Sequence, residues 1–174
     1  DILNPVSYTL AVNDMFFPWQ EFEYGGHEYS KDRGYMFEKV LSENTVGMLD
    51  KKLIDYTEPE RKAEIPMMVY CPNIINDGRK LFIAAQPISY LTKPIHPKKT
   101  NSDFEIDAVE FMKLFKLQDA DSVKFTSVLR MNATFPYINP TVNLPSTPVI
   151  SVMDAGMRDN FGFETTVRFL HVFQ

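Results

Sequence analysis

The sequence predicts an α/β domain, and three kinds of pattern support this prediction. Residues 149–153 form a short apolar run that is rich in β-branched side chains and stops at Asp154. Two further apolar runs of strand length cover residues 66–71 and 80–85. Apolar residues also recur at helical spacing, as they do over residues 163–170. Because short buried strands that alternate with helices are typical of α/β proteins, we expect a central sheet with helices packed against it.

In the first third of the chain, the patterns favour helices. Tyr8, Val12 and Met15 lie at helical spacing. A helix is therefore expected within residues 1–19, and Pro18 ends it. The patterns that follow predict, in order, a loop, a helix, a short helix and a surface connection over residues 20–30, 32–46, 48–56 and 57–64.

The remainder of the chain mixes strands and helices. The turn signal Asn76-Asp77-Gly78 lies between two predicted strands, so a hairpin is expected there. Asp107 and Glu110 have the spacing of a helix capping box, which predicts a helix that starts at Asp107. Another helix is expected to begin near Asp121 and to end before Pro136. A loop, a strand and a final helix follow over residues 137–147, 149–153 and 163–170.

Composition limits the classes of function. The chain has 174 residues, enough for a single domain with a sizeable core. Its formal net charge of -5 argues against a nucleic-acid partner that is held through its phosphates. One Cys excludes an internal disulfide and a multi-Cys zinc site, and the 3 His lack metal-binding spacing, so we expect no metal and no cofactor. No apolar run is long enough to span a membrane and no signal peptide is visible, which leaves the localisation unknown.

A basic cluster lies in the proline-containing segment of residues 87–102. It consists of Lys93, His96, Lys98 and Lys99. Such a cluster is usually a solvated face, and the alternative is contact with an anionic membrane surface.

The strongest candidate for a functional residue is Asp154. This carboxylate follows a predicted buried strand, and the small residues Ala155 and Gly156 allow the chain to turn sharply after it. Open α/β sheets bind their ligands at the carboxyl ends of their strands, so Asp154 is placed where a catalytic carboxylate would be. The plainer alternative is that Asp154, Asp159 and Asn160 are turn formers or helix caps.

The order of several motifs resembles the patatin-like phospholipase family of Ser–Asp acyl hydrolases. The run D-A-G-M-R-D-N-F-G at 154–162 resembles the family's D-G-[GA] motif followed by D-N-x-G. Three weaker similarities precede it in the same order as in the family: Asp32-Arg33-Gly34 with Glu38; Asn76-Asp77-Gly78-Arg79; and Asn132 to Ile138 with Pro140 and Leu144-Pro145. The chain departs from the family in having Ala155 at the second motif position and in lacking the G-x-S-x-G nucleophile elbow and the Gly-rich oxyanion loop.

The resemblance implies that residues 1–174 are a single partial domain, the carboxyl-terminal part of such a hydrolase. We therefore expect part of a three-layer α/β/α sandwich with a central mixed, mostly parallel sheet. Asp154 would act as the base of the dyad and Gly156 would allow close approach of the serine. Ala155, Gly156, Asp159 and Asn160 would support the turn, with Asp159 and Asn160 also capping the last helix.

The same resemblance implies a lipid or ester substrate and a peripheral membrane surface as a candidate partner, without nucleic acid. The nucleophilic serine is expected upstream of Asp1, so the chain alone is expected to be inactive and to self-associate through its unpaired sheet edges. The alternative from another class is a non-catalytic α/β binding or scaffolding domain.

Overall fold

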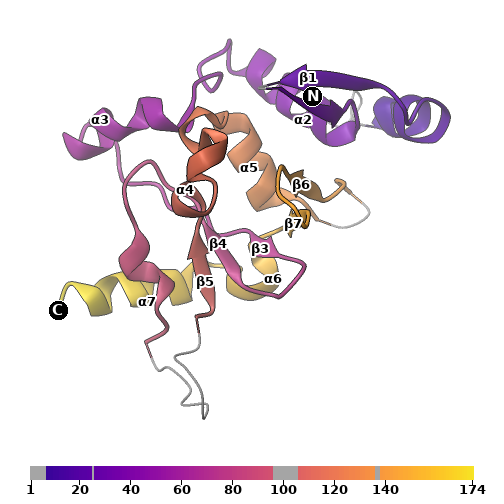
Figure 1. Cartoon of the computed structure of the whole chain (residues 1–174). Helices are drawn as coiled ribbons and strands as arrows, with labels where there is room; N and C mark the ends of the chain where they lie inside the picture. Colours follow the sequence, from indigo (N-terminus) through magenta and orange to yellow (C-terminus); the bar gives the residue numbers. More distant parts are fainter. Residues whose placement is uncertain (1–6, 25, 96–105, 136–137) are drawn as a thin grey trace.

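The computed structural model describes residues 7–24, 26–95, 106–135 and 138–174, and Figure 1 shows their arrangement. Residues 7–16 are helical and include the π-helical turn η1 (Leu10–Asp14). The strands are β1 (Glu21–Tyr24), β2 (His27–Ser30), β3 (Asn73–Ile74), β4 (Lys80–Phe82), β5 (Ala108–Glu110), β6 (Val142–Leu144) and β7 (Ile150–Met153). The α-helices are α2 (Arg33–Asn44), α3 (Thr57–Arg61), α4 (Phe111–Leu114), α5 (Phe125–Ala133), α6 (Gly156–Asp159) and α7 (Phe163–Val172). The short 3-10 helices are η2 (Leu53–Tyr56), η3 (Ser89–Thr92), η4 (Lys116–Gln118) and η5 (Ala120–Ser122).

The centre of the molecule is a five-stranded sheet in the order β5-β4-β3-β7-β6, and a separate hairpin is formed by β1 and β2. The α/β class is confirmed, but the expected mostly parallel sheet is wrong. In the described part of the sheet, only β4 and β5 pair in parallel, whereas β3–β4, β3–β7 and β6–β7 are antiparallel. The physical reason is the length of the connections, because the short segments 75–79 and 145–149 can join only antiparallel neighbours.

Hydrophobic side chains cover both faces of this sheet. Along β4 and the residues after it, side chains alternate between the two faces, as a strand requires. Leu81 and Ile83 belong to one core cluster, which includes side chains of α4 and α5. Phe82 and Ala84 belong to the other cluster, against which Phe169 of α7 packs. Figure 1 accordingly shows α5 and α7 on opposite sides of the strands.

Several predicted elements are confirmed. The helix after Asp32 is α2, and the Asp32 side chain accepts a hydrogen bond from Tyr35 N at its first turn. The Asn76-Asp77-Gly78 signal forms the turn between β3 and β4, where Gly78 has φ of 74°. The strand before Asp154 and the helix after Gly162 are β7 and α7.

Other predicted elements are wrong. Residues 20–30 are expected to be a loop, but β1 and β2 within this range pair as an antiparallel hairpin, and Gly26 before β2 has φ of 78°. Residues 108–110, expected to be helical, form β5 beside β4, so the helix begins only at Phe111. Within the part of the chain that is described, every helix is too short or too polar to cross a lipid bilayer.

Candidate functional site

Asp154 follows directly after β7, an inner strand of the sheet that lies between β3 and β6. Its backbone N–H donates to the Thr134 carbonyl oxygen at 2.8 Å, just after the end of α5. Its own carbonyl oxygen accepts a hydrogen bond of 2.6 Å from the Asn73 side-chain amide of β3. Hydrogen bonds from two separate elements therefore hold the backbone of this half-buried residue.

The carboxylate of Asp154 is oriented by the turn that follows it. Gly156 N–H donates to Oδ1 at 2.5 Å, and no described residue donates to Oδ2. A Cβ atom placed on Gly156 would lie 2.6 Å from Asp154 Oδ1 and 2.8 Å from Asn160 Oδ1. A side chain at position 156 would therefore displace the carboxylate. Because Gly156 has no side chain, the side-chain oxygens of Asp154 and Asn160 in the same turn can lie close to its backbone.

Ala155 is buried and joins the core cluster that lies under α7. Its N–H donates to the Asn132 carbonyl oxygen at 3.3 Å, so the turn packs against the end of α5. A larger side chain at position 155 would have to displace this core, in which Phe82 is fully buried.

Asp159 caps the first turn of α7, as its residue type predicts. Its carboxylate accepts hydrogen bonds from the backbone N–H groups of Glu164 and Thr165 at 3.1 and 2.9 Å, and from the Thr165 hydroxyl at 2.7 Å. Burial raises the pKa of Asp159, but these hydrogen bonds and the charge of Lys80 outweigh it and lower the pKa from 3.8 to about 2. No described hydrogen bond joins Asn160, which is exposed, to α7.

Beneath the turn lies a partly buried ionic network that the sequence analysis did not identify. Lys80 of β4 is fully buried, and its Nζ lies 3.2 Å from Asp159 Oδ2 and 2.8 Å from Glu164 Oε2. Arg168 is also buried and pairs with both Glu164 and Asp107. The sequence did contain a signal for this network, namely a lysine at the start of an apolar strand. A buried ammonium group needs a carboxylate partner, so such a lysine predicts an ion pair. The network ties α7 to β4 and therefore supports the position of the Asp154 turn.

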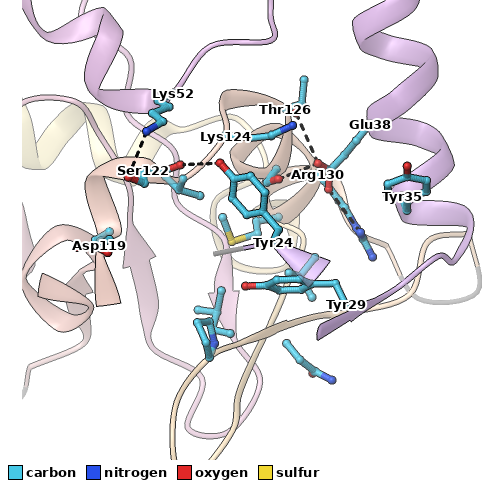
Figure 2. Close-up of a pocket in the computed structure, with 18 of the residues that line it drawn as sticks. Tyr24, Tyr29, Tyr35, Glu38, Lys52, Asp119, Ser122, Lys124, Thr126 and Arg130 are labelled. Atoms are coloured by element: carbon cyan, nitrogen blue, oxygen red, sulfur yellow. Dashed lines mark hydrogen bonds and ion pairs between the residues drawn. The ribbon is translucent and has the colours of Figure 1, made fainter. Parts of the chain in front are cut away.

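The D-R-G-x-x-x-E segment of α2 has a structural explanation. Asp32 and Glu38 both hold the guanidinium group of Arg130 from α5, with distances of 2.9 Å and 3.4 Å. Figure 2 shows the pair of Glu38 with Arg130. Gly34 lies directly under this guanidinium group, where a Cβ atom would overlap it. Arg33 pairs with Asp14 at 2.6 Å. The motif thus joins α2 to α5 and to the preceding helix.

Parts of two sequence signals lie outside the described residues. Lys93 of the basic cluster is described, whereas His96, Lys98 and Lys99 are not. Pro136 and Tyr137 of the loop before the strand are also outside the described ranges. Across the ranges that are described, no group of three or more His, Cys, Asp or Glu side chains could hold a metal ion.

A comparison of the chain with family models, with curated proteins and with solved structures finds no match.

Proposed function

We propose that this chain is part of a lipid acyl ester hydrolase of the patatin-like type and that Asp154 supplies the base of its Ser–Asp dyad. One observation carries the proposal. Asp154 presents a half-buried carboxylate at the end of an inner strand, with Oδ1 held by the Gly156 N–H and Oδ2 without a described partner. A carboxylate that is oriented on one oxygen and unoccupied on the other is suited to accept a proton from a hydroxyl group.

The proposed reaction uses this arrangement in two steps. A serine hydroxyl supplied by residues outside these 174 donates a hydrogen bond to Asp154 Oδ2 and attacks the ester carbonyl carbon. The proton passes to Asp154 and then to the leaving alcohol, which leaves an acyl-serine. Water then attacks the acyl-serine, Asp154 takes its proton and returns it to the serine oxygen, and the acid is released. The donors for the oxyanion would also come from outside these residues.

The same proposal includes the three-layer α/β/α arrangement. The two hydrophobic clusters on opposite faces of the sheet support it, because α4 and α5 cover one face while α7 and η3 cover the other. A lipid substrate and contact with a membrane surface are supported by large exposed side chains near the amino terminus, among them Met15, Phe16 and Trp19.

The experiment is an ester hydrolysis assay on the polypeptide that contains these residues together with its upstream part. Asp154→Asn keeps the size of the side chain but removes the base, so kcat is expected to fall by at least about a hundredfold. Asp77→Asn is the matched control, because Asp77 is an exposed carboxylate in the β3–β4 turn. It is expected to leave kcat unchanged.

A non-catalytic α/β binding or scaffolding domain is the second candidate. It is favoured by the hydrogen bond from Gly156 N–H to Asp154 Oδ1, which is also the contact of an ordinary aspartate turn. The same assay separates the two, since equal kcat values for wild type and Asp154→Asn would support the scaffold and reject the dyad.

A further inference from the structure

A cavity of about 770 Å³ lies between the β1–β2 hairpin and α2 on one side and the helices above the sheet on the other (Figure 2). This volume is within the range of small-molecule binding sites. No residue from 154 to 160 lines the cavity, so it is distinct from the turn at Asp154. An inference about the cavity therefore does not depend on the proposed hydrolase activity.

Part of the cavity wall is apolar, although charged and polar side chains also line the cavity. Phe111, Phe115, Met131 and Leu144 reach it from the core cluster that covers this face of the sheet. Tyrosine side chains from the hairpin and α2 form another part of the wall, and the figure labels Tyr24, Tyr29 and Tyr35 there. A wall of this kind provides apolar surface for the body of a ligand.

Two lysines face each other at the rim. Lys52 and Lys124 are partners in an isolated antiparallel bridge, and both line the cavity. The flanking hydrogen bonds run from Leu53 N to Val123 O and from Phe125 N to Lys51 O. The lysines are therefore a non-hydrogen-bonded pair, the type in which side chains of opposite residues come closest. Like charges in such a pair are unfavourable unless an anion lies between or beside them.

The carboxylates of the chain compensate only part of this charge. Lys124 Nζ lies 3.6 Å from Asp50 Oδ1 and 5.3 Å from the centre of the Tyr24 ring. Lys52 Nζ has the Ser122 hydroxyl at 3.5 Å, and among the described residues no carboxylate forms an ion pair with it. Of the other two cations that line the cavity, Arg130 is paired with Asp32 and Glu38, and Lys39 is paired with Glu43. Asp119 also lines the cavity, but it makes no ion pair with either lysine. Among the described residues, the ammonium group of Lys52 therefore has no ion-pair partner, and it lies at a cavity whose wall is partly apolar.

We propose that this cavity binds an amphipathic anion, an apolar chain or ring that carries one carboxylate or phosphate group. The anionic group lies at the rim between Lys52 and Lys124 and accepts a hydrogen bond from the Ser122 hydroxyl. The apolar body extends inward against Phe111, Phe115 and Met131. The ligand needs both its anionic group and its apolar body. The lysines are only partly shielded from water, so they bind an anion weakly by themselves. The apolar wall alone does not select an anion.

Isothermal titration calorimetry with the 174-residue chain tests the proposal, with octyl phosphate, octanoate, octanol and inorganic phosphate as probes. Octyl phosphate or octanoate is expected to bind with a stoichiometry of one site and about tenfold more tightly than octanol, since a hydrogen-bonded charge contributes about that factor. Inorganic phosphate is expected to bind more weakly than octyl phosphate, because it lacks the apolar body. The ratio of octanoate to octyl phosphate affinity identifies which anionic group the rim prefers.

The variant Lys52→Gln/Lys124→Gln is expected to lose about tenfold in affinity for the better anionic probe while octanol binding stays unchanged. Ser122→Glu, which places a carboxylate of the chain beside Lys52, is expected to reduce anion binding as well. Lys116→Gln is the control, because Lys116 is exposed and does not line the cavity. Equal affinities for octanol and both anionic amphiphiles, or wild-type anion affinity in the double variant, would overturn the proposal.

Discussion

Lys80 and Asp159 show how single residues hold the region of the candidate site. The two are 79 positions apart in the sequence, yet both side chains are buried and in contact. No local pattern encodes such a pair, so the sequence suggested a strand at Lys80 and a cap at Asp159 without joining them. The position of Asp154 after a strand was predictable because its signal is local: an apolar run, a carboxylate and two small residues in succession.

The stability of the chain should depend on pH through Asp159. Its folded-state pKa of about 2 is below its ordinary value of 3.8, so its contribution is fully present above about pH 4 and is lost as the pH falls toward about 2. Asp159→Asn is expected to lower the free energy of unfolding at neutral pH by about 2 kcal/mol, the contribution of hydrogen bonds to a charged group. The free energy of unfolding of this variant should also fall less than that of the wild type between about pH 4 and about pH 2.

Urea unfolding at a series of pH values measures both effects. Asp121→Asn serves as the control, because Asp121 is exposed in η5. A variant at Asp159 that retained the wild-type acid dependence would show that another group is responsible.

At the scale of elements, the D-R-G-x-x-x-E motif is explained by the packing of α2 against α5. Gly34 would normally be an unfavourable residue inside a helix, and Ala would gain about 1 kcal/mol there. Here the guanidinium group of Arg130 occupies the space of the missing side chain. The guanidinium group can move away only by giving up its ion pairs with Asp32 and Glu38, so Gly34→Ala is expected to destabilise the chain by about 1–3 kcal/mol.

The matched control for this prediction is Gly34→Ala in an Arg130→Ala background. With the guanidinium group removed, the same substitution should become neutral or stabilising. Thermal or urea unfolding of the wild type, the two single variants and the double variant measures the free energy changes of this cycle. An equal destabilisation by Gly34→Ala in both backgrounds would refute the packing explanation.

Secondary structure was least predictable where distant segments decide it. Residues 107–110 carry a capping signal, but parallel pairing with β4 makes Ala108 to Glu110 a strand. The β1–β2 hairpin is rich in charged residues, so its sequence has no clear strand pattern. It is stabilised by a contact with another element, since the ring centres of Phe22 and of Tyr35 in α2 lie 4.7 Å apart. Elements with strong local signals, such as α2 with its Asp32 cap and β7 with its apolar run, were predicted correctly.

At the scale of the whole molecule, the outer strands of the sheet are β5 and β6. Large apolar side chains are also exposed at both ends of the described chain, such as Trp19 at 68% and Phe173 at 65%. Outer strands that pair on one side only among the described residues, and large exposed apolar side chains, favour association between copies. We therefore expect the 174-residue chain to self-associate when it is produced alone, and sedimentation velocity measures this directly. A single monomeric species over a wide concentration range would contradict the expectation.

The central claim is that the carboxylate of Asp154 activates a serine carried by another part of the polypeptide. Covalent labelling by a fluorophosphonate probe tests it most directly, because the reaction reports on the serine without requiring the natural substrate. In the polypeptide that includes the upstream part, we predict labelling of one serine, and Asp154→Asn should slow that labelling by about a hundredfold while Asp77→Asn does not. Labelling at the same rate in wild type and Asp154→Asn would contradict the claim.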